Sequence, residues 1–261
     1  MKNADSVRVF ITGASSGIGA ELSRWYIKRG ATVFGAARRA DRLEALREEC
    51  GDSFVPVSLD VTDTAAVERT LLAFDDEHGG IDTVVANAGV GHHRHGAKLT
   101  AAEVFAVNRV NIDGAVATML ALVPRMVARG QGRIVAISSL VAHRGISRHA
   151  VYCASKAFIS TFAESLRVDL KRVGVSVTTV EPGWVKSEMT AKNKFPMPFL
   201  METADAAALA GEAIEARRRL VSFPSPVAIG GRFLLPAVPG WLYERAVAPP
   251  PPSQKLRGEK Q

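Results

Sequence analysis

Cysteine is scarce in this sequence of 261 residues, and its scarcity argues against a disulfide framework. Only Cys50 and Cys153 occur, far apart and without the spacing of a metal site, which indicates a reducing compartment. An uninterrupted apolar run of the roughly 18 residues that a transmembrane helix needs is also missing. The residues after Met1 lead into a strand-like segment without the apolar region of a signal peptide. We therefore expect a cytoplasmic protein.

The composition is ordinary apart from its charge. Apolar residues make up 47% of the chain, aromatic residues 7% and charged residues 23%, as in a typical soluble protein. The formal net charge is +7, which favours an anionic partner such as a nucleic acid, a membrane surface or an anionic cofactor. Because Lys and Arg are scattered along the chain, we expect no nucleic-acid binding.

Short β-branched segments alternate with segments of helical spacing along most of the chain. Segment 7–12 predicts a buried strand, and segment 17–30 predicts a helix that ends at a glycine. The same reasoning predicts strands at 31–37, 53–59, 81–86, 132–138, 175–180 and 220–223, and helices at 40–50, 63–78, 100–129, 151–173 and 203–219. This alternation is typical of a parallel sheet covered on both faces. We predict an α/β fold with a doubly wound parallel sheet of the Rossmann type, in a single domain.

The pattern weakens after residue 186. We divide the chain into a dinucleotide-binding and catalytic core at 1–190, an extension of the same domain at 191–248 and a disordered tail at 249–261. Within the extension, segment 227–247 is apolar but interrupted by prolines and arginines. Two interpretations remain open for it: a lid over a substrate cleft, or a contact with the interface of a membrane.

A glycine-rich loop follows the first predicted strand. It reads Thr12-Gly13-Ala14-Ser15-Ser16-Gly17-Ile18-Gly19 and opens the first predicted helix. Glycines at such a position let the backbone turn sharply and approach a pyrophosphate, whose charge then faces the N-terminus of the helix. Because the loop lies between a strand and a helix, it predicts a dinucleotide site.

An acidic residue is missing at the end of the second predicted strand. NAD-binding members of such folds usually place a carboxylate there to accept hydrogen bonds from the ribose 2′-hydroxyl. This chain has Ala37 instead, followed by Arg38 and Arg39. A guanidinium group matches a phosphate bidentately, so we predict NADP(H) as the cofactor, with Arg38 as the main ligand of the 2′-phosphate. Arg39 and Ser15 are the possible helpers.

Tyr152 and Lys156 lie four residues apart in the predicted helix 151–173, and therefore on one face of it. A free tyrosine has a pKa of about 10 and accepts a proton poorly at neutral pH. A nearby ammonium group favours the phenolate, so we expect Lys156 to lower the pKa of Tyr152 toward the operating pH of an acid/base catalyst.

These motifs resemble the short-chain dehydrogenase/reductase family over about residues 7 to 190. The resemblance also rests on Asp60-Val61-Thr62, Asn87-Ala88-Gly89, Asn111, Ser139 and Pro182-Gly183, which stand in the family's order. It implies an oxidoreductase in which Ser139 polarises the substrate oxygen, Tyr152 is the acid/base, and Lys156 also bonds the nicotinamide ribose. It further implies that Asn111 orders a water in a proton relay to Lys156, while Ser138 is a structural partner.

The resemblance also completes the predicted cofactor site. Asp60 and Val61 would line the adenine pocket, the backbone of Val185 would meet the nicotinamide carboxamide, and Ser187 keeps a hydroxyl where many members have threonine. The full predicted set is Gly13, Ser15, Ser16, Gly17, Ile18, Gly19, Arg38, Arg39, Asp60, Val61, Asn87, Ala88, Gly89, Tyr152, Lys156, Pro182, Gly183, Val185 and Ser187.

A run of histidines and a cysteine beside Tyr152 could suggest a metal site and a nucleophile, but we expect neither. The run His92-His93-Arg94-His95 has no carboxylate or thiolate partner nearby in the sequence, so we expect the rim of the substrate cleft and no metal. Cys153 points to a different helix face from Tyr152, and we interpret it as a packed thiol.

The predicted helices 100–129 and 151–173 indicate self-association. We expect their outward faces to carry Val104, Val107, Phe158, Phe162 and Leu166, more apolar surface than a monomer usually exposes. This predicts a homodimer or homotetramer.

The sequence therefore predicts an NADP(H)-dependent oxidoreductase that transfers a hydride between nicotinamide and a carbonyl or secondary alcohol. The alternatives are an NAD-linked enzyme of the same fold, a non-catalytic dinucleotide-binding protein and a protein of the membrane surface. The small-molecule substrate and the direction of the reaction are open at this stage, because the loops that form the pocket carry no fold-level signal.

Overall fold

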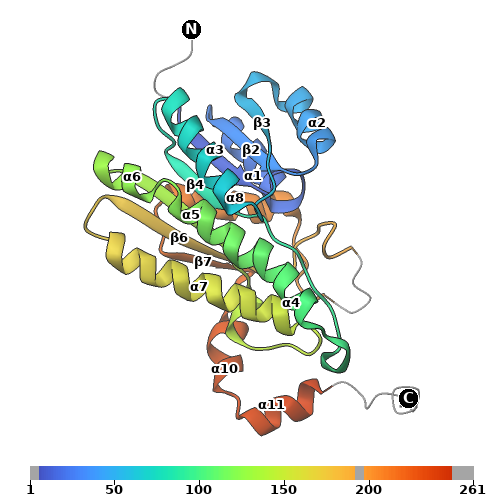
Figure 1. Cartoon of the computed structure of the whole chain (residues 1–261). Coiled ribbons are helices and arrows are strands. Elements are labelled where there is room, and N and C mark those ends of the chain that lie inside the picture. The colour runs from blue at the N-terminus through green and yellow to red at the C-terminus, as the bar shows by residue number, and fades with distance from the viewer. Residues whose placement is uncertain (1–5, 192–196, 249–261) are drawn as a thin grey trace.

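The computed structural model describes residues 6–191 and 197–248, which form one seven-stranded sheet covered by helices (Figure 1). All six neighbouring strand pairs are parallel, in the order β3-β2-β1-β4-β5-β6-β7. The strands are β1 (Arg8–Thr12), β2 (Thr32–Ala37), β3 (Phe54–Ser58), β4 (Thr83–Ala86), β5 (Gly132–Ile137), β6 (Val175–Pro182) and β7 (Leu220–Phe223). The predicted doubly wound parallel sheet is confirmed.

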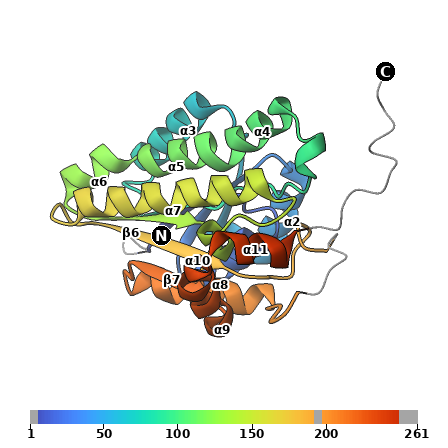
Figure 2. The same ribbon diagram turned by 90° about the horizontal axis from the view of Figure 1, so that it is seen from below.

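Helices cover both faces of the sheet, as Figure 2 shows from below, and a separate hydrophobic cluster lies on each face. One face is covered by α1 (Gly17–Ile27), α2 (Ala40–Cys50) and α8 (Thr203–Glu215). The other is covered by α3 (Thr64–Glu77), α5 (Ala115–Leu120), α6 (Val123–Arg129) and α7 (Ala150–Leu170). The central strands β1, β4 and β5 are buried on both sides over most of their length, which explains their mostly apolar sequences.

The predicted helix 100–129 is interrupted. It consists of α4 (Ala101–Asn108), a π-helical turn (Arg109–Gly114), α5 and α6. Gly114 lies so close to Val61 that an added Cβ would meet the valine side chain at 2.8 Å. By length and composition, residues 101–129 could span a membrane, but 44% of the apolar window is buried inside the fold. In this structure the segment is a covering helix of the sheet, because α5 contacts α3 and β4.

A C-terminal arm, residues 225–247, extends beyond β7 at the lower end of the molecule in Figure 1. It contains α9 (Ser225–Ile229), a π-helical turn (Gly230–Leu234), α10 (Leu235–Ala237) and α11 (Gly240–Val247), which the sequence analysis did not predict. Proline stands in the first turn of α9 and α10 and precedes α11, so the helices stay short.

The C-terminal arm leaves most of its large apolar side chains in solvent. Phe233 is 65% exposed and Trp241 69%, whereas Ala228 is the one buried residue among those described in the arm. The arm therefore adds little to the core. The predicted tail, residues 249–261, lies outside the described residues.

Candidate active site

The predicted site motifs follow β1, β4, β5 and β6, and therefore gather at the carboxyl edge of the sheet. The order of the strands reverses between β1 and β4, which is the point where ligands bind in open parallel sheets. The fold thus brings together motifs that lie more than a hundred residues apart in the chain.

The glycine-rich loop has the tight geometry that a phosphate cradle needs. Gly13 has φ +71°, and a Cβ on Gly19 would meet the Gly13 carbonyl oxygen at 2.4 Å. At Gly17, with φ +58°, an added Cβ would meet only Ser187 across the loop, at 3.6 Å. Ser16 begins α1 without a side-chain cap, and the first turn carries no acidic residue. The uncapped N–H groups and the close approach that glycine permits fit the pyrophosphate of a dinucleotide.

Asn87 holds the glycine-rich loop in place. Its Nδ2 donates to the carbonyl oxygens of Thr12 at 2.9 Å and Gly13 at 3.2 Å. The buried Thr12 hydroxyl in turn donates to the Val85 carbonyl oxygen and accepts from the Asn87 amide, both at 3.2 Å. These bonds join the ends of β1 and β4, so the role of Asn87 seen here is to position the loop.

The arginines after β2 take different positions. Arg38 is exposed, with its guanidinium 3.9 Å from the Asp60 carboxylate. The Arg39 guanidinium instead donates to the hydroxyls of Ser15 at 3.0 Å and Ser16 at 2.7 Å, and pairs with Glu188 at 2.6 Å. Of the two arginines that follow Ala37, Arg39 therefore contacts the loop directly, whereas Arg38 lies beside Asp60.

Asp60 and Val61 both make contacts that fix the loop after β3. The Asp60 carboxylate accepts hydrogen bonds from the Thr62 amide and hydroxyl, which lower the pKa of Asp60 together with the charge of Arg38. Val61 is buried against Gly114. This contact ties the loop after β3 to the π-helical turn.

Tyr152 and Lys156 lie one turn apart near the beginning of α7, as predicted. Lys156 is only 5% exposed, and its Nζ donates to the Ile137 carbonyl oxygen at 2.8 Å. This Nζ lies 5.8 Å from the centre of the Tyr152 ring and would be 3.5 Å from a Cβ on Gly89. The lysine therefore reaches from α7 under the ends of β4 and β5.

The expected lowering of the Tyr152 pKa is wrong for the protein without its cofactor. Burial raises this pKa to about 12, against an opposing hydrogen bond with Ser139. Burial also lowers the pKa of Lys156 to about 8. In this low-dielectric site the cost of desolvating a charge exceeds the attraction between ammonium and phenolate, so the phenol is neutral at pH 7.

The two serines after β5 have separate partners. The Ser139 hydroxyl donates to the Pro182 carbonyl oxygen at 3.2 Å and bonds Tyr152, which places it beside the phenol. The Ser138 hydroxyl donates to the Lys156 carbonyl oxygen at 2.9 Å and lies 2.7 Å from the Ser160 hydroxyl. Ser138 therefore anchors α7 to the sheet.

Asn111 lies in the π-helical turn and is 1% exposed. Its Oδ1 accepts from the Val90 amide at 2.8 Å, and its Nδ2 donates to the Val90 carbonyl oxygen and the Ser155 hydroxyl, both at 3.0 Å. The turn widens the helix at this position, a common feature of functional sites. Asn111 thus fixes the loop after β4 against α7.

The loop after β6 lies against the glycine-rich loop. The Gly183 amide donates to the Phe223 carbonyl oxygen at 2.7 Å, and the buried Val185 forms an isolated bridge with Met201. The Ser187 amide donates to the Thr190 hydroxyl at 2.9 Å. Ser187 faces Gly17, as the distance of 3.6 Å between its Cβ and the added Cβ shows.

A buried carboxylate that the sequence analysis missed lies behind the site. Glu181 is 1% exposed and ends β6. It bonds His143 at 3.0 Å, Ser222 at 2.8 Å and Ser160 at 3.3 Å, and pairs with Arg232 of the C-terminal arm at 3.4 Å. The sequence could have indicated this residue, because an acidic side chain inside a buried strand needs partners.

The expectation that the histidine run has no carboxylate partner nearby is wrong. His92 lies 3.9 Å from the Glu103 carboxylate, which also pairs with Arg94 at 3.3 Å. A carboxylate is therefore near, although it is bound to an arginine. Within residues 6–191 and 197–248, no group of three or more potential ligands converges on a metal position.

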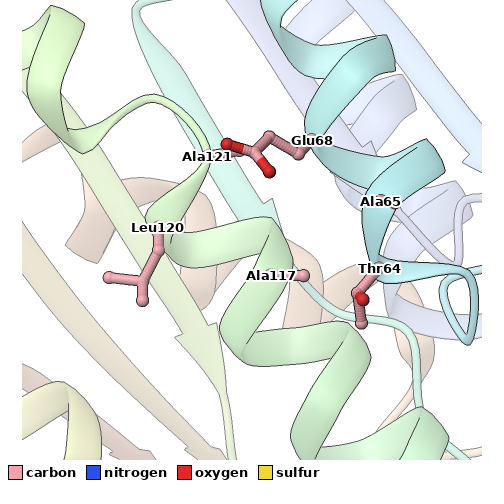
Figure 3. Close-up of a pocket in the computed structure, with 6 residues that line it drawn as sticks. All are labelled: Thr64, Ala65, Glu68, Ala117, Leu120 and Ala121. Carbon is pink, nitrogen blue, oxygen red and sulfur yellow. The ribbon is translucent and has the colours of Figure 1, made fainter.

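Cys153 is buried beside Tyr152, and burial raises the pKa of its thiol. It is a packed thiol, as expected, and both cysteines are free. A shallow pocket of about 290 Å³ lies elsewhere, between α3 and α5 (Figure 3). None of its lining residues belongs to the predicted site. They are Thr64, Ala65, Glu68, Ala117, Leu120 and Ala121.

The fold and site define a dinucleotide-binding oxidoreductase, and comparison with known proteins gives its family. Residues 7–196 match the short chain dehydrogenase family, and the chain belongs to it. An uncharacterized oxidoreductase of Myxococcus xanthus (strain DK1622) is 48% identical over 239 residues, covering 90% of this chain and 94% of the relative. A serine 3-dehydrogenase of Agrobacterium fabrum (strain C58 / ATCC 33970) is 38% identical over 183 residues, covering 70% of this chain and 73% of the relative.

Among solved structures, a short-chain dehydrogenase from Sphingobium yanoikuyae in complex with NADPH is similar, with a TM-score of 0.77 and 27% identity. The alignment covers 98% of this chain and 96% of that protein, and therefore includes the extension beyond residue 190.

Proposed function

We propose that this protein is an NADP(H)-dependent oxidoreductase that reduces a carbonyl compound, or oxidises the corresponding secondary alcohol, at Ser139, Tyr152 and Lys156. The observation that carries this proposal is the convergence of a neutral phenol, a hydroxyl bonded to it and a buried lysine that lies beside Gly89 in the loop after β4. A bound nicotinamide supplies or accepts the hydride.

The protein's own residues handle the proton and the substrate oxygen. Ser139 donates a hydrogen bond to the carbonyl oxygen and orients it toward Tyr152. The Tyr152 phenol, which burial keeps protonated, donates its proton to that oxygen as negative charge develops there. Lys156 stabilises the resulting phenolate and bonds the nicotinamide ribose, in line with the resemblance. Asn111 holds the loop after β4 and is the candidate for ordering a water on the path to Lys156.

The preference for NADP(H) over NAD(H) rests on Ala37, Arg38 and Arg39. A carboxylate is absent where it would bind the 2′-hydroxyl, and two guanidinium groups lie beside Ser15 and Asp60. The Sphingobium yanoikuyae relative, in complex with NADPH, supports this preference.

Tyr152→Phe tests the mechanism. The variant removes one hydroxyl, so we expect retained folding and NADPH binding but a loss of turnover of about a hundredfold or more. The assay is the loss of NADPH absorbance with a panel of aldehydes, neutral ketones and oxo acids. Tyr26→Phe is the matched control, because Tyr26 lies in α1, bonds Glu215 at 3.1 Å and stays outside the proposed site.

Near-normal kcat in Tyr152→Phe would refute the mechanism. A wild-type protein that binds NADPH but reduces no member of the panel would favour the alternative of a non-catalytic dinucleotide-binding protein.

Self-association through α4 and α7 is our proposal for the assembly. Phe105 and Phe158 are exposed on these helices, and Phe158 stacks on Phe162 with ring centroids 5.9 Å apart. Val107, expected on the outer face, is instead buried, because α4 turns that side toward the core. Light scattering should therefore show a dimer or tetramer that Phe105→Glu dissociates.

We also propose a cytoplasmic protein whose C-terminal arm makes a peripheral membrane contact. Ile229, Phe233, Leu234, Trp241 and Leu242 are exposed on the arm, more apolar surface than an isolated segment usually presents to water. Sedimentation with vesicles of anionic lipid tests the contact. Binding lost in a Phe233→Ser, Trp241→Ser double variant would support it, whereas an arm-dependent change of oligomer size without lipid would assign the arm to assembly.

A further inference from the structure

Two loops at the entrance of the candidate active site carry basic residues and no acidic residue. Residues 91–99 follow β4, and residues 143–149 precede α7. Their basic side chains are His92, His93, Arg94, His95, Lys98, His143, Arg144, Arg148 and His149. Several of them already have partners. Arg94 and His92 lie within ion-pair distance of Glu103. His143 bonds Glu181, and the Arg144 guanidinium lies over the Tyr243 ring of the C-terminal arm.

The two loops touch directly in front of α7. The Arg94 amide donates to the Arg148 carbonyl oxygen at 2.8 Å, and the rings of His93 and His149 meet edge to face with centroids 4.9 Å apart. We call His93, Arg148 and His149 the basic rim. It lies one helical turn before Tyr152.

Arg148 combines a left-handed backbone conformation with a guanidinium group that forms no ion pair within the described residues. Its φ is +65°, a left-handed conformation that costs a non-glycine residue free energy and that concentrates at functional sites. Its side chain is exposed, and no carboxylate among residues 6–191 and 197–248 lies within ion-pair distance of its guanidinium. The strained backbone is held by the hydrogen bond from Arg94.

The N-terminus of α7 adds to the positive potential at the basic rim. This helix of 21 residues begins at Ala150, the N-cap residue His149 makes no side-chain capping bond, and the first turn carries no acidic residue. The partial positive charge of its N–H groups therefore stays uncompensated by the protein. The pKa of His93 is lowered by burial and by the charges of His149, Arg148 and His92, as expected in a region of positive potential.

We infer that the basic rim binds the carboxylate of the substrate, so that the enzyme reduces oxo acids or oxidises hydroxy acids. This inference rests on the proposed function. The single guanidinium of Arg148 matches a carboxylate bidentately, and the helix N-terminus adds further donors. His149 lies three residues before Tyr152, about 4.5 Å along the helix axis. The carboxylate is therefore a few bonds away from the carbonyl that receives the proton.

The test compares short 3-oxo and 4-oxo acids with their methyl esters, which keep the carbonyl and lose the charge. We expect wild-type kcat/KM to be roughly tenfold or more higher for the acids. Raising the salt concentration should increase KM for the acids and leave KM for the esters unchanged.

Two variants of Arg148 separate binding from folding. Arg148→Gln should raise KM for the acids about tenfold, with kcat and the kinetics of the esters nearly unchanged. Arg148→Gly should raise KM for the acids to a similar extent. Because glycine adopts positive φ without steric cost, backbone strain cannot explain a rise in KM in this variant. Arg148→Lys should restore part of the loss. Arg172→Gln, on an exposed position just beyond the other end of α7, is the control and should change neither substrate.

Equal kcat/KM for acids and esters, or an equal loss for both in Arg148→Gln, would overturn the carboxylate site. So would reduction of neutral ketones in the panel without reduction of any oxo acid. If the wild type binds NADPH but reduces no carbonyl compound at all, the proposed function itself fails.

Discussion

Lys156 should make the folded protein less stable at neutral pH than at alkaline pH, and the structure gives the size of the effect. Burial lowers the pKa of Lys156 from 10.5 to about 8. At 1.36 kcal/mol per pKa unit this shift corresponds to about 3 kcal/mol of unfavourable free energy when the buried ammonium is charged. The penalty is present below pH 8 and disappears as the pH rises to 10.5.

The sign follows from proton binding. Between pH 8 and pH 10.5 the unfolded chain holds a proton on Lys156 that the folded protein has lost. The free energy of unfolding therefore rises with pH across this window. Lys156→Met keeps the length of the side chain and removes the titration, so the difference between wild type and variant isolates this one group. Between pH 7 and pH 10 that difference should move by about 2 to 3 kcal/mol in favour of the wild type.

Urea denaturation of both proteins at pH 7, 8, 9 and 10, without cofactor, measures the difference. Other groups titrate in the wild type and in the variant alike, so their contributions cancel in the difference between the two free energies of unfolding. Lys171→Met, at an exposed position at the end of the same helix, should show no such movement. A Lys156→Met difference that stays constant with pH within about 0.5 kcal/mol would refute the reasoning, because the lysine would then be solvated in the folded state.

Two further changes test the cofactor site and the buried carboxylate. Arg38→Asp should reverse the cofactor preference, because a carboxylate repels the 2′-phosphate and accepts from a 2′-hydroxyl; fluorescence titration should show the wild type binding NADPH roughly tenfold more tightly than NADH, and equal affinities would contradict the role of Arg38. Glu181→Ala should lower the free energy of unfolding by about 3 kcal/mol, because His143 and Arg232 lose their acceptor. Glu181→Gln keeps one acceptor oxygen and should cost less, and thermal denaturation of the two variants distinguishes them.

The succession of strands and helices along the chain could be predicted from the sequence because the signals are local. Strands such as Thr83–Ala86 are buried on both faces and therefore have continuous apolar sequences. The interruption of helix 100–129 could not be predicted, because it depends on the approach of Gly114 to Val61, fifty residues earlier in the chain. The helices of the C-terminal arm escaped prediction because prolines punctuate an apolar segment that has no periodicity.

The residues of the candidate site could be named from their spacing, but their protonation could not. The spacing of four residues from Tyr152 to Lys156 predicts a shared helix face, and the structure has it. The pKa values depend on what covers the pair, which is β5 and the loop after β4. Arg39 shows the same limit: the sequence places two arginines beside the loop, and only the folded backbone decides which one contacts Ser15 and Ser16.

Burial shifts the pKa values of Tyr152 and Lys156, the proposed catalytic pair, in opposite directions. It keeps the Tyr152 phenol protonated, which suits a group that gives a proton to a carbonyl oxygen. It brings the pKa of Lys156 to about 8, so the lysine still carries its charge at pH 7. An ammonium that is already desolvated needs little reorganisation when a phenolate or an anionic cofactor arrives, and it stabilises that charge more strongly than a solvated lysine would. The stability lost to the buried charge is thus the source of its electrostatic effect in the proposed reaction.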